Sequence, residues 1–464
     1  MRFVVAAALL ILAPIGWADD APEEPKPQRI VAIEGGTVLT MTGAPVENGT
    51  VVITDGKITA VGVGVEVPDG AERIDATGKT VMPGLIDAFS RLYIYPQDLS
   101  EGSAIAADLR VIDGIDPYSD DGEEVIQHGV TSVHVLPGSR GLIAGLSAVV
   151  KVGAGDGSVE VVSDAVATRG QIGIPSGSST SSLAKLGNYT SIREALLGAR
   201  DYQFGWEKYE RQLSEYDRKT SPPDEEDGDE EEDAEGEDVE EDEDADEKPG
   251  GDEKKPKEKK PDAEKPDRPK KPGIDHGKDV LVRALKREIP LLIEAHRVPD
   301  ILNALRLDDE FDIDLVLLGC SEGHRIAAEI TRREVPVIVG PVSLSVARPS
   351  RIRYGDHSRA NAAILAEAGV TVALGVGGEV ALHSKLTRAS AAIAVANGLS
   401  RQAALEAITI RPAEVLGVAD RVGSLAEGRD ADILILSGDP LDVRSPVDAV
   451  LVGGEVVFER EADG

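Results

Sequence analysis

Three histidines and one glutamate lie where apolar segments end. His134 closes one apolar segment, His296 follows another, and His383 follows the last one. Glu294 lies two residues before His296, so both side chains face the same side if this stretch is a strand. Imidazole and carboxylate groups bind metals and transfer protons. One hypothesis is that these four residues converge on a site. The alternative is that each histidine is an ordinary packed or surface residue.

The segments that carry these residues alternate with helix-like stretches. The apolar segments are residues 132–136, 290–295, 314–318, 335–339 and 370–374. Strand–helix alternation implies right-handed crossovers and a parallel sheet. With this many repeats we expect an α/β fold built on a closed, TIM-like (β/α)₈ barrel, whose functional residues lie at the carboxyl ends of the strands.

Both ends of the chain have a different sequence pattern. They contain short segments that are rich in β-branched residues and are separated by turn residues. They predict a small β-sandwich domain assembled from the two ends. The expected organisation is a signal peptide (1–18), a linker (19–28), the amino-terminal strands of the sandwich (29–82), the first barrel half with a helical extension (83–220), an insertion (221–273), the second barrel half (274–409) and the carboxyl-terminal strands of the sandwich (410–464).

The start of the chain has the pattern of a secretory signal. Arg2 precedes an apolar run over residues 3–15, and residues 16–18 (Gly-Trp-Ala) follow it, before an acidic start. We therefore expect an exported protein, periplasmic or extracellular, without stable membrane insertion after cleavage. An uncleaved anchor is the alternative, although about 20 apolar residues are needed to span a bilayer. Cys320 is the only cysteine, so no internal disulfide forms.

The charge of the chain excludes nucleic acid as a partner. The formal net charge is −35 and aromatic residues make up 3% of the chain, so a phosphate backbone would be repelled and few rings could stack on bases. Residues 224–247 contain nineteen acidic residues and no basic one. The insertion is too polar to form a core, so we expect it to be disordered. It is either a solvated loop or a segment that binds a partner.

Several sequence segments, in their order along the chain, resemble segments of the amidohydrolase superfamily, especially of its imidazolonepropionase-like branch. They are residues 81–88 (VMPGLIDA), 129–133 (GVTSV), 349–372, 410–414 (IRPAE) and 423–432 (GSLAEGRDAD). The resemblance covers about residues 29–460, with the insertion outside it. It implies a metal-dependent hydrolase whose ligands are a His-x-His pair, a strand-four lysine, histidines on strands five and six, and a strand-eight aspartate that is also the general base.

Most of these implied positions hold unsuitable residues. Lys151 and His296 match the strand-four and strand-five ligands. The other four positions are occupied by Phe89 and Arg91 at the His-x-His pair, Gly319 on strand six and Gly377 on strand eight. Two ligands fall short of the three usual in catalytic zinc sites. We therefore expect no cofactor, or zinc or another divalent metal if the protein is active.

Charge could replace the missing metal at the barrel mouth. Arg91 and Lys151 bring positive charge there, and Glu294 brings a negative one. We therefore predict that these three residues form an ion-paired cluster. The candidate pocket comprises this cluster with His134, His296 and His383.

Three functional hypotheses follow. The first is an exported, catalytically degenerate amidohydrolase that retains a pocket for a small molecule or a protein. The second is an active metal-dependent hydrolase of carbon–nitrogen bonds, in cyclic amides or dipeptides, with a rebuilt site. The third is an interaction protein that acts through its acidic insertion.

Overall fold

The computed structural model describes residues 28–95, 103–138, 141–153, 159–173, 182–220, 267–342, 355–377 and 381–461. The predicted signal peptide, almost all of the linker and residues 221–266 of the insertion lie outside these ranges. Within them, no helix is both long and apolar enough to cross a membrane.

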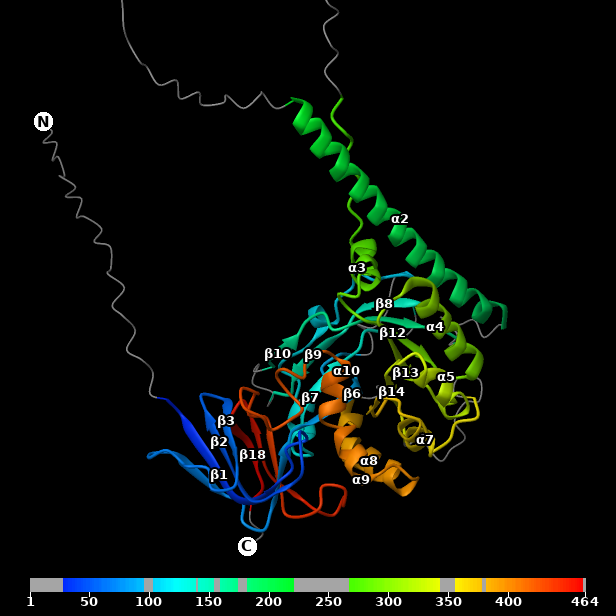
Figure 1. The fold of residues 1–464 in the computed structure, drawn as a ribbon. Coiled ribbons are helices and arrows are strands. Elements are labelled where there is room, and N and C mark those ends of the chain that lie inside the picture. Colours follow the sequence, from blue (N-terminus) through cyan, green and yellow to red (C-terminus); the bar gives the residue numbers. More distant parts are fainter. Residues whose placement is uncertain are drawn as a thin grey trace, which may run out of the picture.

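One sheet joins the two ends of the chain, as Figure 1 shows by its blue and red strands lying together. Its strands follow the order β18-β17-β16-β5-β1-β2-β3, with β4 paired to β1. Antiparallel pairing of β5 with β16 makes the junction between the two ends. The strands are β1 (Ile30–Val38), β2 (Val46–Thr54), β3 (Lys57–Gly62), β4 (Glu72–Asp75), β5 (Thr80–Pro83), β16 (Ile433–Leu436), β17 (Val447–Val452) and β18 (Glu455–Glu459).

The barrel is built from parallel strands with helices outside them. Its parallel strands are β6 (Leu85–Ser90), β7 (Val130–Val135), β11 (Thr168–Gln171), β12 (Leu291–Ala295), β13 (Leu315–Gly319), β14 (Val337–Val339) and β15 (Val372–Leu374). The helices are α1 (Asp121–Ile126), α3 (His276–Leu285), α4 (Val298–Phe311), α5 (Ala327–Thr331), α7 (Asn361–Glu367), α8 (Thr387–Ala396), α9 (Arg401–Glu406) and α10 (Ile410–Val415), with short turns η2 (Val111–Gly114), η3 (Gly323–Arg325) and η4 (Ala381–Leu386). The predicted fold class is confirmed.

One segment runs against the others. β8 (Ile143–Leu146) and β9 (Ala148–Lys151) follow each other across Ser147, and β9 pairs antiparallel with β7 while β8 pairs antiparallel with β11. This segment connects the two halves of the barrel wall, and β10 (Val161–Ser163) flanks β9. Because its direction is reversed, the residue that ends β9 lies at the amino ends of the parallel strands, away from the barrel mouth.

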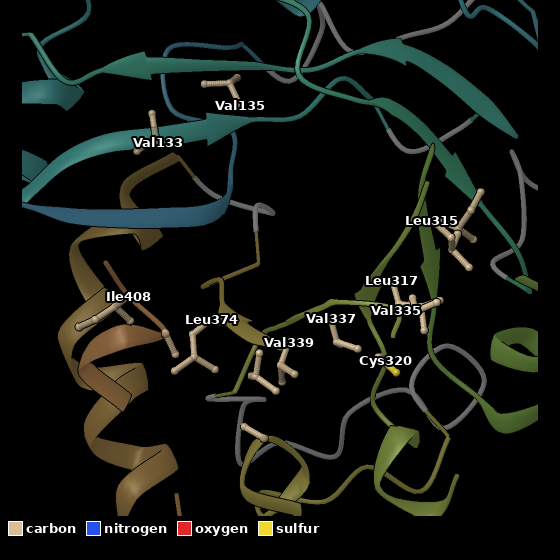
Figure 2. Packing of buried hydrophobic residues seen from close by; sticks show 14 of the residues in the cluster. Val133, Val135, Leu315, Leu317, Cys320, Val335, Val337, Val339, Leu374 and Ile408 are labelled. Atoms are coloured by element: carbon tan, nitrogen blue, oxygen red, sulfur yellow. The ribbon is translucent and has the colours of Figure 1, made fainter. Parts of the chain in front are cut away.

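Side chains alternate between the interior and the helix layer along the parallel strands. Leu292, Leu318 and Ile338 belong to a cluster inside the barrel. Their neighbours Leu317 and Val337 belong to the larger cluster packed under the helices, part of which Figure 2 shows. The strands are therefore buried on both faces, which explains their continuous apolar sequences.

The predicted helical extension is a single long helix, α2 (Ser182–Thr220), of 39 residues. It projects from the barrel beside α3 in Figure 1. Tyr202 anchors it, because its hydroxyl donates to Asp279 of α3 at 2.8 Å. Near the end of the insertion, Lys271 Nζ lies over the ring of Trp206, 5.7 Å from the ring centroid.

Buried charges fasten the barrel to the terminal sheet. Lys151 at the end of β9 is 2% exposed, and its Nζ lies 2.8 Å from Asp430 Oδ2 and 3.3 Å from Asp432 Oδ1. Lys57 and Arg421 also bond Asp430. Burial alone would raise the pKa of Asp430, but hydrogen bonds from Lys151 and Lys57 hold it at about 2.

Replacing Lys151 by Met should destabilise this junction. The substitution leaves two buried carboxylates with one cation fewer, and breaking a buried pair costs about 3–5 kcal/mol. Lys57→Met is the matched comparison, because Lys57 bonds the same Asp430 from a half-exposed position and should therefore lose less stability than Lys151→Met. The free energy of unfolding in guanidinium measures both. Equal losses in the two variants would contradict the junction's dependence on Lys151.

Candidate functional site

A polar cluster occupies the barrel interior below its mouth. Arg169 comes from β11, Glu294 from β12, and His296 follows β12 directly. Side-chain alternation points all three inward, since Ala167 and Leu292, two residues before Arg169 and Glu294, both belong to the interior cluster. All three side chains are 1% exposed. The strands thus bring a cation, an anion and an imidazole together out of water.

Arg169 is the cation of this cluster. Its Nη2 forms an ion pair with Glu294 Oε2, and its Nη1 donates to the carbonyl oxygen of Gly138 at 3.1 Å and to that of Pro137. Its Cζ lies 5.9 Å from the ring centroid of Phe89. A guanidinium stacked on an aromatic ring and bonded to a carboxylate is a favourable environment for a buried cation.

His296 has a bonding partner at each ring nitrogen. Its Nε2 lies 3.1 Å from Glu294 Oε1, and its Nδ1 lies 2.8 Å from Ser321 Oγ. Gly319 makes room for the ring. A Cβ at Gly319, where φ is +84°, would lie 2.3 Å from His296 Cε1. The imidazole therefore fills the space that a strand-six side chain would need.

The residues present do not fit the divalent metal that the fold family implies. Phe89, Gly319 and Gly377 offer no side-chain donor, and a Cβ at Gly377 would lie 2.9 Å from Pro341 Cδ. Across the described ranges, no three His, Cys, Asp or Glu residues are grouped so that they could hold a metal ion. The buried Arg169 guanidinium adds a positive charge that would repel a metal cation.

A buried carboxylate joins the first barrel strand to the last. Asp87 of β6 is fully buried and accepts from the N–H of Phe89 at 3.0 Å, the N–H of Val376 at 3.1 Å and the hydroxyl of Ser384 at 2.7 Å. Burial raises the pKa of Asp87 despite these three donors. Asp87, from the segment VMPGLIDA, thus connects the first barrel strand with the residues that follow the last one.

His134 lies inside the barrel wall rather than in a pocket. Its Nδ1 is 3.0 Å from the carbonyl oxygen of Ala88 and its Nε2 is 2.8 Å from Ser147 Oγ. Burial lowers the pKa of His134 to about 4, so the ring is neutral at pH 7. It donates from Nδ1 and accepts at Nε2, which makes His134 a structural link between β6 and the β8–β9 segment.

The predicted convergence of four residues occurs only in part. Glu294 and His296 face the same side of the strand, as their spacing predicted, and they are bonded to each other. His383 lies partly buried on η4 beside Ser384, the residue that bonds Asp87. His134 bonds elsewhere, so the four side chains do not form one metal-binding group.

The predicted ion-paired cluster of Arg91, Lys151 and Glu294 is wrong for Lys151. Lys151 pairs with Asp430 and Asp432 at the opposite end of the barrel, because β9 runs antiparallel. Glu294 pairs with Arg169 instead. Arg91 follows β6 and is partly buried. Because β9 is reversed, Lys151 does not lie at the strand-four position of the barrel. That position belongs to β11, which pairs with β12.

Sequence reasoning missed two residues of this site. Arg169 lies in the polar sequence Thr-Arg-Gly-Gln, which lacks the apolar run that marks the other strands. Ser321 lies in Gly-Cys-Ser-Glu-Gly, residues 319–323, and the spacing of its glycines is the signal that could have found it.

Comparison with known proteins supports the fold. Residues 365–458 match the amidohydrolase family. The amidohydrolase from Thermotoga maritima has a TM-score of 0.74 and 24% identity, covering 93% of this chain and 100% of that one. The chain has the amidohydrolase-superfamily fold. The predicted resemblance is therefore confirmed at the level of the superfamily.

Shorter stretches of this amidohydrolase-fold chain match two curated proteins. The 5-methylthioadenosine/S-adenosylhomocysteine deaminase of Symbiobacterium thermophilum is 48% identical over 64 residues, 13% of this chain and 14% of that protein. The imidazolonepropionase of Staphylococcus aureus strain Newman is 53% identical over 47 residues, 10% of this chain and 11% of that protein. The matched stretches are thus a small share of either relative.

Replacing Arg169 by Met should destabilise the barrel by about 3–5 kcal/mol, because Glu294 would remain buried without its cation. The double variant Arg169→Met with Glu294→Leu should lose less than Arg169→Met alone, since it leaves no unpaired charge. Chemical denaturation measures both. Arg193→Met is the control, because its exposed pair with Glu310 should contribute about 0–1 kcal/mol. A loss at Arg169 no larger than at Arg193 would refute the argument.

His134 should make the protein less stable in mild acid. Its pKa is about 4 when folded and 6.5 in the unfolded reference, so the unfolded chain binds more protons between these values and stability falls as pH falls. At pH 5 this costs about 2 kcal/mol relative to pH 7. Unfolding measured at both pH values should show a smaller difference in His134→Gln than in wild type. The exposed His128→Gln should behave as wild type, and an unchanged difference in His134→Gln would contradict the assignment.

Proposed function

We propose that this is an exported amidohydrolase-fold protein that has lost metal-dependent hydrolysis. The observation that carries the proposal is the buried guanidinium of Arg169, held between Glu294 and the ring of Phe89 inside the barrel. Export rests on the leader-like sequence alone, which lies outside the described residues.

Coordination chemistry supports the loss of metal-dependent hydrolysis. A catalytic zinc site commonly uses three protein ligands and an open position where bound water ionises near pH 7. Here His296 is a suitable metal ligand at the strand-five position that the resemblance implies. However, its two ring nitrogens are bonded to Glu294 and Ser321. The activities named for the deaminase and imidazolonepropionase relatives are therefore not proposed for this chain.

A small recess remains beside this cluster. Ser321, Gly340, His357 and Asn361 contribute to its lining, and its volume is about 20 Å³. A space of this size holds about one water molecule or one small chemical group. It lies after β13 and β14, at the end of the barrel where proteins of this architecture carry their sites.

Metal analysis of the purified full-length protein tests the proposal. After incubation with zinc or manganese and removal of excess ion, we expect substoichiometric metal and an unchanged melting temperature. A site that bound the ion would add about 2.7 kcal/mol of stability at an ion concentration one hundred times its Kd. His296→Ala is the matched variant. Stoichiometric metal in wild type that disappears in His296→Ala would overturn the proposal in favour of an active hydrolase of carbon–nitrogen bonds.

A further inference from the structure

Ser321 lies in a turn whose sequence is Gly-Cys-Ser-Glu-Gly, residues 319–323. The turn leaves the carboxyl end of the parallel strand β13, passes through the three-residue turn η3 and leads to the helix α5. Gly-x-Ser-x-Gly between a strand and a helix is typical of the sharp turn that presents a nucleophilic serine. The sequence pattern and its structural context therefore agree.

The backbone of this turn is tightly constrained. Gly319 has φ +84° and Cys320 has φ +47°, two consecutive left-handed residues of which only the first is glycine. A Cβ at Gly323 would lie 2.6 Å from Cys320 Sγ, and one at Gly319 would strike the ring of His296. Both glycines are thus required by close contacts. The strain at Cys320 is of the kind that surrounding structure maintains at functional turns.

Ser321 is hydrogen-bonded to a base, and the base is hydrogen-bonded to a carboxylate that orients it. Ser321 Oγ lies 2.8 Å from His296 Nδ1, and His296 Nε2 lies 3.1 Å from Glu294 Oε1. Because the carboxylate only accepts, Nε2 carries the proton and the Nδ1 lone pair faces the serine hydroxyl. Nucleophile, base and orienting acid within hydrogen-bond reach are the arrangement of serine-dependent acyl transfer.

A second serine–histidine pair in the barrel shows what distinguishes Ser321. Ser147 Oγ is also 2.8 Å from a histidine, His134, but the other nitrogen of that ring bonds a backbone carbonyl instead of a carboxylate. Ser147 is fully buried, whereas Ser321 lines the recess at the mouth. Of these two pairs, only that of Ser321 combines a carboxylate with a place for a substrate group.

We propose that Ser321, His296 and Glu294 form a metal-independent site that transfers small acyl groups from esters. Ser321 is the nucleophile, His296 the base and Glu294 the positioning residue for His296. The recess of about 20 Å³ has room for only the smallest acyl groups. The inference rests on the proposed function, because His296 serves as a base only if it does not ligate a metal.

The reaction balances with water as the second reactant. Ser321 Oγ bonds to the acyl carbon while the bond from that carbon to the ester oxygen breaks. The hydroxyl proton passes to His296 Nδ1 and then to the leaving oxygen. Water attacks the acyl-serine in the same way, releasing the carboxylic acid and restoring the hydroxyl.

Two contacts should lower the rate of acyl transfer at this site. The N–H of Glu322, which follows the serine and would be an oxyanion donor in such turns, donates to the carbonyl of His296 at 2.9 Å. Losing one oxyanion donor costs a factor of about 10²–10³ in rate. Arg169 also shares the charge of Glu294, which weakens the stabilisation of a protonated His296. Esters with good leaving groups are therefore the substrates that we expect to react.

The test uses the full-length, metal-free protein with p-nitrophenyl acetate and with a fluorophosphonate probe. We expect release of nitrophenolate and covalent modification of Ser321, located by peptide mass spectrometry. Ser321→Ala should abolish both. His296→Asn should slow labelling by about 100-fold, the contribution of a general base. Ser400→Ala is the control, because Ser400 is exposed at the start of α9, outside the recess, where its hydroxyl accepts from the N–H of Ala403.

The outcomes separate this inference from the proposed function. Unmodified Ser321 in metal-free wild type overturns the acyl-transfer site and leaves the loss of metal-dependent hydrolysis standing. Equal labelling of wild type and His296→Asn also overturns it, because His296 would then not act as the base. Metal that depends on His296 overturns both. Locating the modified residue in wild type does not require any variant to fold.

Discussion

The ion pair between Arg169 and Glu294 determines how the barrel interior is arranged. Each charge would cost several kcal/mol to bury alone, so neither is tolerated without the other. Glu294 uses one oxygen for Arg169 and the other for His296, and this second bond orients the ring toward Ser321. The ring of Phe89 lies against the guanidinium where the fold family implies a metal-binding histidine. A protein cation thus lies beside one of the implied ligand positions.

An ion pair of this kind is not strong evidence for stability. Replacing a buried pair by well-packed apolar residues is often neutral or stabilising, because desolvation offsets the Coulomb attraction. The contribution of Arg169 and Glu294 therefore lies in geometry. They fix one ring orientation of His296, and the glycine at position 319 leaves the space for that ring. The substitutions at Phe89 and Gly319 fit the bulky cation and the imidazole beside them.

The reversed direction of β9 separates two charged centres that the sequence placed together. Lys151 lies at the junction with the terminal sheet, where Asp430 and Asp432 neutralise it. Arg169 lies in the interior near the mouth. One strand direction thus decides which basic residue lies at the junction between domains and which one pairs with Glu294.

The sequence by itself determined the fold class. The continuous apolar strands of residues 290–295 and 314–318 became β12 and β13, because strands buried on both faces need apolar side chains at every position. The shared face of Glu294 and His296 also followed from local spacing, since strand side chains repeat every two residues. Only the tertiary structure decided the cation, because Arg169 and Glu294 are 125 residues apart and meet through pairing of β11 with β12. It also decided the place of Lys151, since the direction of a strand depends on its neighbours in the sheet and not on its own residues.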